Sequence, residues 1–104
     1  MINTVSKGRR HVAKIIKWLR QQGYEADSCE YRTKWATYDL FGADIVFKDE
    51  ADIGFIQAKA NRGHVAQGIR ELRKGKWPKF VRRLVVHWPA RGKAPEVWDA
   101  SKCD

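Results

Sequence analysis

Residues 39–59, which read DLFGADIVFKDEADIGFIQAK, hold the side chains of this chain that are best suited to chemistry. The stretch contains two mainly apolar runs, residues 43–47 and 53–60, separated by the acidic segment KDEAD. Apolar runs on either side of a short polar segment are typical of the two strands of a β-hairpin. We therefore predict a hairpin with this acidic segment as its turn.

The predicted hairpin would gather an acid, an amide and an amine at one strand edge. Because successive side chains of a strand point to opposite faces, Gln57 and Lys59 face one way, and Ile56 and Ala58 face the other. Strand pairing would bring Asp44 close to the first pair. Taken singly, an Asp before an apolar run is more often a turn residue, and a Lys at a strand end is more often solvated. The joint spacing favours a site for a divalent cation and an activated water.

The charge of the chain points to a polyanionic partner. The 104 residues carry a net charge of +9, and such a field favours nucleic acid. Residues 1–40 hold eight Lys or Arg against four acids, residues 41–60 hold two against four, and residues 61–104 hold eleven against four. An acidic island between two basic arms suits a metal-dependent phosphodiester enzyme, whose cations hold the backbone and whose carboxylates hold the metal.

Several classes of protein are disfavoured by the sequence. No apolar run approaches the roughly 20 residues of a membrane helix, and the N-terminal residues do not resemble an export signal. Cys29 and Cys103 have no zinc-type spacing, so we predict two reduced thiols and no thiolate metal site. We expect a cytoplasmic protein of a prokaryotic or phage-infected cell, with no membrane partner.

Helical spacing of apolar residues predicts one helix before the hairpin and one after it. The first would begin after Ser6 as N-cap and end before Gly23, and the second would run from near His64 to Lys74 or Gly75. The apolar stripe of the first helix consists of Val12, Ile15, Ile16 and Leu19.

The remaining segments favour strands. Residues 24–38 are predicted as one extended segment with its aromatic side chains in the core, residues 80–88 as a buried strand, and residues 96–100 as a short last strand. The order is helix, three strands, helix, two strands (αβββαββ). We expect a single domain over residues 1–104 with an α/β (α+β) fold, in which helices flank a central mixed five-stranded sheet.

The order of elements and the pattern Asp44-x12-Gln57-x-Lys59 resemble the PD-(D/E)XK nuclease superfamily. Within it, the chain is most similar to small archaeal or phage-type Holliday junction resolvases. The shared features are a Lys-Gly pair at residues 7–8, GADIV at residues 42–46 and the LVVHW strand. The resemblance implies a restriction-endonuclease-like fold and hydrolysis of DNA with Mg²⁺ or Mn²⁺ as cofactor.

The resemblance also implies roles for individual residues. Asp44 corresponds to the metal-binding acid of the first motif strand, and Lys59 is the lysine of the motif. Gln57 stands where the family usually has Glu or Asp, and the main-chain carbonyl of Ala58 would complete the metal shell.

Two departures from the family pattern concern the carboxylates. Gln57 replaces a motif acid, so it contributes an amide oxygen without charge. The resolvases place a Glu early in the first helix, where this chain has Arg-Arg-His at residues 9–11. Glu25, Glu30 or Asp39 could supply the second carboxylate from the neighbouring segment.

The sequence thus predicts a Mg²⁺-dependent endodeoxyribonuclease that prefers Holliday junctions or other branched DNA. Paired cuts at a junction require two active sites, so we expect a homodimer. An alternative is a DNA-binding protein of the same fold with impaired catalysis, and a third interpretation is a small basic RNA-binding protein unrelated to nucleases. The side chains expected to hold DNA are Lys7, Arg9, Arg10, Arg62 and Gln67.

Overall fold

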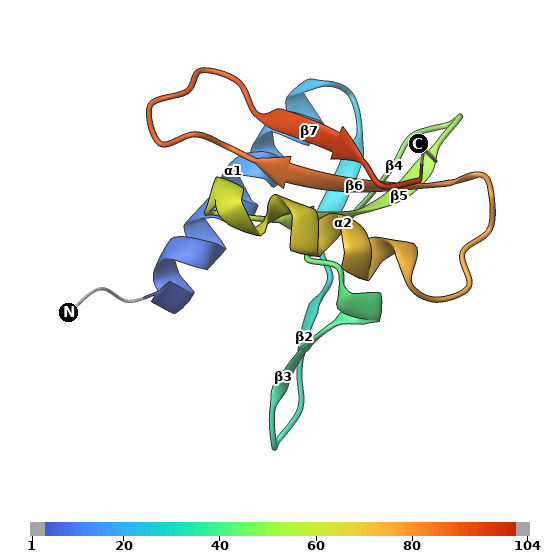
Figure 1. Ribbon diagram of the computed structural model, residues 1–104, viewed down its shortest axis with the longest axis horizontal. Helices are drawn as coiled ribbons and strands as arrows, with labels where there is room; N and C mark the ends of the chain where they lie inside the picture. Colours follow the sequence, from blue (N-terminus) through green and yellow to red (C-terminus); the bar gives the residue numbers. More distant parts are fainter. Residues whose placement is uncertain (1–3, 102–104) are drawn as a thin grey trace.

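The computed structural model describes residues 4–101, with side chains for residues 10–30, 33–36, 38 and 40–101. Figure 1 shows the arrangement of the helices and strands. In chain order, they are α1 (Thr4–Gln21), β1 (Glu25–Ser28), β2 (Glu30–Arg32), β3 (Thr37–Asp39), a 3₁₀ turn η1 (Leu40–Gly42), β4 (Ile45–Lys48), β5 (Ile53–Ala58), a 3₁₀ turn η2 (Arg62–His64), α2 (Val65–Arg73), β6 (Val81–His87) and β7 (Glu96–Asp99).

Five of these strands form one mixed sheet in the order β1-β4-β5-β6-β7. Strands β5 and β6 are parallel, and the other neighbours are antiparallel. A parallel pair needs a crossover between its strands, and α2 makes this connection. The α+β class and the mixed five-stranded sheet with helices are confirmed.

The two helices cover opposite faces of the sheet, and each face therefore has its own apolar core. On the α1 face, the buried residues are Ile15, Leu19, Ala26, Ile45, Phe47, Ile56, Leu84 and Val86. On the α2 face, they are Val65, Leu72, Val85 and Ala100. The second cluster is much smaller, so part of the α2 face is left for polar side chains.

The end of α1 agrees with the sequence, whereas its start does not. Gly23 has φ 96°, the Tyr24 N–H donates to the Leu19 carbonyl at 3.1 Å, and the Gly23 N–H donates to the Arg20 carbonyl at 3.1 Å. These two bonds make a Schellman ending, which glycine favours because it has no Cβ. The helix already includes Thr4, so Ser6 lies inside it, and its prediction as the N-cap was wrong.

The β4–β5 hairpin forms as predicted, with the acidic segment as its turn. The Asp49 carboxylate accepts hydrogen bonds from the backbone N–H groups of Ala51 at 2.8 Å and Asp52 at 2.6 Å. These bonds stabilise the charged form and lower the pKa of Asp49. An acidic side chain is therefore suited to this turn for a structural reason.

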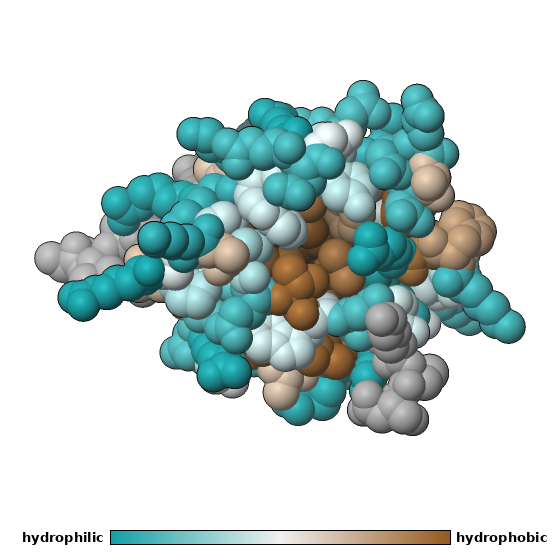
Figure 2. Space-filling view, turned by 90° about the horizontal axis from the view of Figure 1, so that it is seen from above, coloured by the Kyte–Doolittle hydropathy of each residue, from teal (hydrophilic) through white to brown (hydrophobic). Residues whose placement is uncertain are grey.

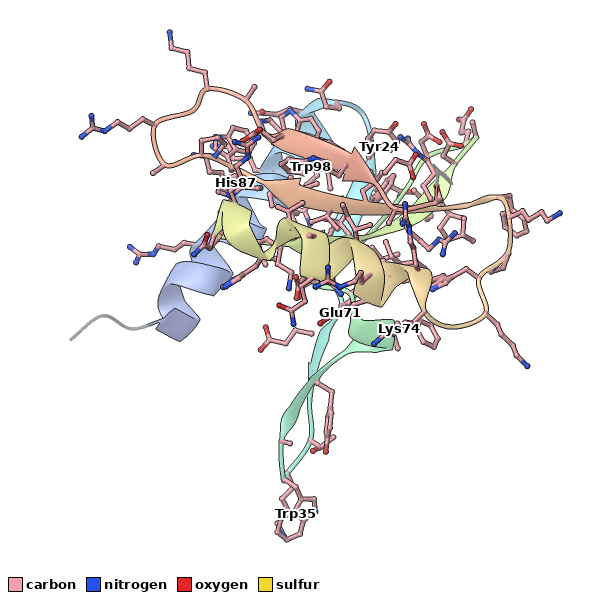
Figure 3. All side chains as sticks on the ribbon, viewed as in Figure 1. Tyr24, Trp35, Glu71, Lys74, His87 and Trp98 are labelled. Carbon is pink, nitrogen blue, oxygen red and sulfur yellow. The ribbon has the colours of Figure 1, made fainter. Side chains whose placement is uncertain are left out.

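The prediction of one extended strand over residues 24–38 was wrong. The chain breaks into β1, which joins the main sheet, and a separate β2–β3 hairpin that projects from the body (Figure 1). Trp35 lies at its tip with 85% of its surface exposed, and Figure 3 shows it far from the other labelled residues. The Thr33 hydroxyl organises this tip by accepting hydrogen bonds from the N–H groups of Trp35 and Ala36. The hydrogen bonds of Thr33 and the β2–β3 pairing therefore determine the structure of this segment, although its aromatic residues had favoured a strand in the core.

Figure 2 shows one face, on which hydrophilic side chains surround a central apolar patch. Cys29 is buried, and Cys103 lies outside the described residues. Over residues 4–101, no helix has both the length and the apolar character needed to cross a bilayer.

We expect Gly54→Ala to destabilise the fold strongly. A Cβ at residue 54 would lie 2.6 Å from Phe47 Cζ and 2.8 Å from the carbonyl oxygen of Arg82 on β6. Because one of these atoms is backbone, the clash cannot be relieved by a side-chain rotation, and we expect a loss of about 2 kcal/mol or more in urea unfolding. The control is Gly63→Ala, whose Cβ would meet only a side-chain oxygen of Asn61 at 3.2 Å. Equal unfolding midpoints for the two variants would contradict this account of the β5 packing.

Candidate metal and phosphate site

Strand β5 and the residue after it carry two polar side chains beneath helix α2. Gln57 is only 4% exposed, although it is polar, and Lys59 is half-buried. The Lys59 N–H donates to the Val86 carbonyl at 2.9 Å, so the pairing with β6 continues past the end of β5. Ile56 belongs to the core on the α1 face, and Ala58 packs against that core. The predicted alternation of the two pairs of side chains is confirmed.

A glycine in α2 lets the helix lie close to these two side chains. A Cβ at Gly68 would lie 3.0 Å from Gln57 Oε1, 3.0 Å from Lys59 Cε and 3.3 Å from Val85 Cγ2. Glycine in a helix interior costs about 1 kcal/mol relative to alanine. The close approach explains why glycine occupies this position.

Asp44 reaches the same strand from the start of β4. Its N–H donates to the Ile56 carbonyl at 2.8 Å, and its Oδ2 accepts from the Ala58 N–H at 2.8 Å. The two contacts lie on either side of Gln57 in the sequence, so Asp44 pairs with β5 at this point. Its closeness to the Gln57 and Lys59 side chains stays a prediction. Asp44 touches Ala58 through the amide N–H; the role of the Ala58 carbonyl stays a prediction.

Glu71 is a further carboxylate at this site that the sequence did not reveal. Its Oε2 accepts a hydrogen bond from Gln57 Nε2 at 3.0 Å, and its Oε1 accepts one from Gln67 Nε2 at 3.1 Å. Figure 3 shows Glu71 on α2, on the side of the helix nearer the β2–β3 hairpin. Gln67 and Glu71 are four residues apart and so lie on one helix face. This spacing links Glu71 to Gln67, but it gives no signal for the contact with Gln57.

The hydrogen bond from Gln57 is the main cause of a lowered pKa for Glu71, and the nearby Lys59 ammonium acts in the same direction. A lowered pKa keeps this carboxylate ionised at neutral pH. Glu71 is therefore suited to binding a cation and not to donating a proton.

The oxygen of the Gln57 amide, Oε1, is buried, and no donor to it is found in the described part of the chain. A buried acceptor left unpaired costs roughly 1–3 kcal/mol, so such atoms call for an explanation. A cation or a ligand donor at this position would satisfy the oxygen.

The oxygen atoms present fit a hard divalent cation. Among the side chains that the structure describes, which do not include Asp39, no group of three or more His, Cys, Asp or Glu could hold a metal ion. Mg²⁺ does not need such a cage, because it is usually held by one or two carboxylates together with waters and substrate phosphates. Asp44 and Glu71 supply two carboxylates at neighbouring residues of β5, the first through the Ala58 N–H and the second through Gln57 Nε2.

The other acids considered from the sequence are placed less favourably or lie partly outside the description. Glu25 forms an ion pair with Lys48 near the opposite end of the β1–β4 pairing from Asp44, so it does not supply the second carboxylate. Glu30 and Asp39 face each other in the β2–β3 pairing, and the side chain of Asp39 lies outside the described residues.

The basic residues predicted to hold DNA have mixed surroundings. Arg10 is exposed on α1, and Arg62 lies 3.6 Å from Glu96 in an exposed ion pair. Gln67 is exposed and is bonded to Glu71. The side chains of Lys7 and Arg9 lie outside the described residues.

His87, on the neighbouring strand β6, contacts the backbone of the site. It is buried on β6, and its Nδ1 lies 2.8 Å from the carbonyl oxygen of Lys59. This contact holds the main chain at Lys59.

Comparison with known proteins adds no family assignment. No protein-family model matches the chain, and no curated protein is significantly similar to it.

We expect the pKa of Glu71, measured by NMR titration of its carboxyl carbon, to lie below the ordinary value of 4.5. Gln57→Leu should raise that pKa, because the variant removes the main stabilising hydrogen bond. Since the folded-state pKa is below the unfolded value, ionised Glu71 stabilises the fold above pH 4.5, and this contribution is lost as the pH falls through the folded-state pKa. An unchanged Glu71 pKa in Gln57→Leu would show that the hydrogen bond does not form in solution.

Proposed function

We propose that this protein is a metal-dependent DNA endonuclease of the PD-(D/E)XK type that acts on branched DNA. The observation that carries the proposal is the buried Gln57 Oε1, which has no donor among the described residues. The nitrogen of the same amide donates to Glu71, and Lys59 approaches the same helix residue, Gly68, as Oε1 does. The net charge of +9 supports a polyanionic substrate. We also propose that the protein acts in the cytoplasm, where its DNA substrate is present.

Three oxygen-bearing side chains would hold the cation. Asp44 and Glu71 would provide negative charge, and Gln57 Oε1 would provide a neutral ligand from below α2. A bound Mg²⁺ or Mn²⁺ would supply charge neutralisation at the phosphoryl group and activation of the attacking water. The proposed second carboxylate comes from α2, whereas the resolvase pattern takes it from the first helix.

Lys59 would act on the phosphate itself. Its stem packs against Gly68, so the flexible side chain is confined before substrate arrives. A positioned ammonium stabilises the negative charge that develops on the phosphoryl oxygens in the transition state. Lys7, Arg9, Arg10 and Arg62 would hold flanking phosphates, and Gln67 would keep Glu71 oriented.

The branched substrate makes a homodimer part of the proposal. Paired cuts on a junction need two active sites related by a two-fold axis. Sedimentation with junction DNA would give the number of chains in the complex.

A second candidate is a DNA-binding protein of this fold that has lost catalysis. Two observations favour it: the motif acid is replaced by Gln57, and Asp44 Oδ2 is already occupied by the Ala58 N–H. Cleavage assays on four-way, nicked and linear DNA with Mg²⁺ or Mn²⁺ separate the two candidates.

We expect Asp44→Asn and Lys59→Met each to lower the cleavage rate by about 100-fold or more. The first removes an anionic ligand of the cation, and the second removes the ammonium that stabilises charge on the phosphoryl oxygens. Asparagine retains an oxygen for the Ala58 N–H, so the fold should survive. DNA affinity measured at one salt concentration should stay within about threefold of the wild type, since other cations supply most phosphate contacts.

Asp52→Asn is the matched control, because Asp52 is an acid on the β4–β5 turn away from Gln57. It should cut at the wild-type rate. Wild-type cleavage by Asp44→Asn would exclude Asp44 from the site, and a wild type inactive on every substrate would favour the non-catalytic candidate.

Gln57→Glu should tighten Mn²⁺ binding by about tenfold or more in calorimetry at pH 8, because a neutral ligand becomes an anion. The new carboxylate would lie within hydrogen-bond distance of Glu71. Because two carboxylates this close repel each other when both are ionised, the pair would share a proton in the absence of metal. The gain should therefore shrink at pH 5. Unchanged or weaker affinity at pH 8 would show that residue 57 does not contact the ion.

A further inference from the structure

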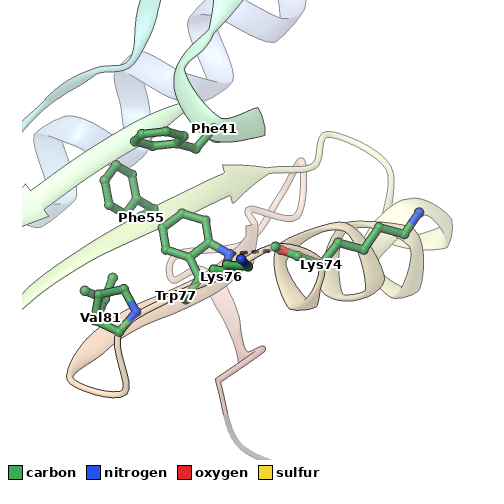
Figure 4. Close-up of a pocket in the computed structure, with 8 residues that line it drawn as sticks. Phe41, Phe55, Lys74, Lys76, Trp77 and Val81 are labelled. Atoms are coloured by element: carbon green, nitrogen blue, oxygen red, sulfur yellow. Dashed lines mark hydrogen bonds between the residues drawn. The ribbon is translucent and has the colours of Figure 1, made fainter.

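A second feature near the candidate site is an aromatic cavity of about 480 Å³, drawn in Figure 4. Three rings surround it: Phe41 and Trp77 have centroids 6.0 Å apart, and Phe55 and Trp77 have centroids 5.2 Å apart. Its volume lies within the usual range for small-ligand pockets, roughly 300–1,000 Å³. The lining residues are Phe41, Phe55, Lys74, Gly75, Lys76, Trp77, Pro78 and Val81.

The cavity and the candidate site are built on the same three segments. Phe41 is three residues before Asp44, and Phe55 is two residues before Gln57 on the same face of β5. Lys74 follows Glu71 by three residues, at the end of α2. Two residues along a strand span about 6.6 Å, close to the step between nucleotides of an extended strand.

Phe41 is largely exposed, and the polar edge of the Trp77 ring already has a partner. Phe41 has a left-handed backbone with φ 53°, and its side chain is 70% exposed. A bulky residue in this conformation is strained, and such residues cluster at functional sites. Trp77 Nε1 donates to the Lys74 carbonyl at 3.1 Å (the dashed line in Figure 4), so the polar edge of its ring is satisfied within the protein.

We propose that this cavity binds one unpaired nucleobase of a DNA strand, next to the nucleotide whose phosphate lies at Gln57 and Lys59. This inference rests on the proposed function, action on DNA. It specifies the protein's substrate as DNA that contains unpaired nucleotides. Stacking on aromatic rings accepts any base, because every base has a π-face. The protein would therefore recognise a branch point by its unstacked base and not by its sequence.

The surrounding charge favours a nucleotide over an apolar protein segment. Lys74 and Lys76 are among the lining residues, although Figure 4 shows the Lys74 ammonium directed away from the rings. The Arg83 guanidinium is 5.9 Å from the Trp77 ring. Cations beside aromatic rings are the usual composition of single-stranded nucleic acid sites.

The experiment compares binding of a labelled single-stranded oligonucleotide and its duplex by fluorescence anisotropy, in EDTA and at one salt concentration. Phe41→Ala should weaken single-strand binding by about 5- to 100-fold, the size of one lost base stack, and should leave duplex binding within about twofold. Trp77→Leu should act in the same direction. Phe80→Ala is the matched control, because Phe80 is 74% exposed and lies outside the cavity lining.

A scan with single abasic positions in a gapped duplex locates the bound base. At one position of the scan, removal of the base should weaken DNA binding by the wild type. Removal of the same base should leave DNA binding by Phe41→Ala unchanged. Equal losses on single strand and duplex, or an equal loss in Phe80→Ala, would overturn the inference. The inference would also be overturned if the wild type sedimented as a dimer without DNA and Phe41→Ala sedimented as a monomer. A second copy of the chain would then occupy the cavity.

The metal-free measurement separates this inference from the nuclease activity. If Phe41→Ala has the expected effect and the wild type cuts no DNA, the base site stands and the catalytic proposal fails. If the wild type cuts branched DNA and Phe41→Ala binds and cuts like the wild type, the catalytic proposal stands and the base site fails.

Discussion

The close contact between α2 and β5 at Gly68 is the constraint on which the rest of the structure depends. A larger residue there would push the helix away from Gln57, Lys59 and Val85 together. The contact therefore couples the small apolar core on this face to its polar site. It also sets where Glu71 lies, because Glu71 is three residues further along the same helix.

The two faces of the sheet differ in the kind of side chain that they bury. The α1 face holds the larger apolar core, which can stabilise a chain of this size. The α2 face holds a buried amide in a position where an apolar side chain would pack more simply. The Gln57–Glu71 hydrogen bond offsets part of the cost of burying that amide, and Gln57 Oε1 remains without a donor among the described residues. Polar groups retained at such a cost are characteristic of functional sites.

The proposed base site and the proposed metal site share their supporting elements, and this sharing constrains how DNA could lie. Phe41 and Asp44 belong to one connection, with Gly42 at φ 74° between them. Phe55 and Gln57 lie on one strand face, so a nucleotide strand running along β5 could present a base to the first and a phosphate to the second. The β2–β3 hairpin begins beside this connection and carries the exposed Trp35 away from the body (Figure 3).

Much of the local structure could be predicted from the sequence, because its causes are local. The alternation of side chains along β5 determined which of them share a face. The apolar stripe determined α1, and Gly23 determined its end. The acidic segment determined the hairpin turn. The break within residues 24–38 was missed, since aromatic content indicates a strand without indicating its partner. Glu71 and the aromatic cavity were decided by the tertiary structure alone. Which residue of α2 lies over Gln57 depends on how a crossover helix docks on the sheet, and no spacing along the chain encodes that contact.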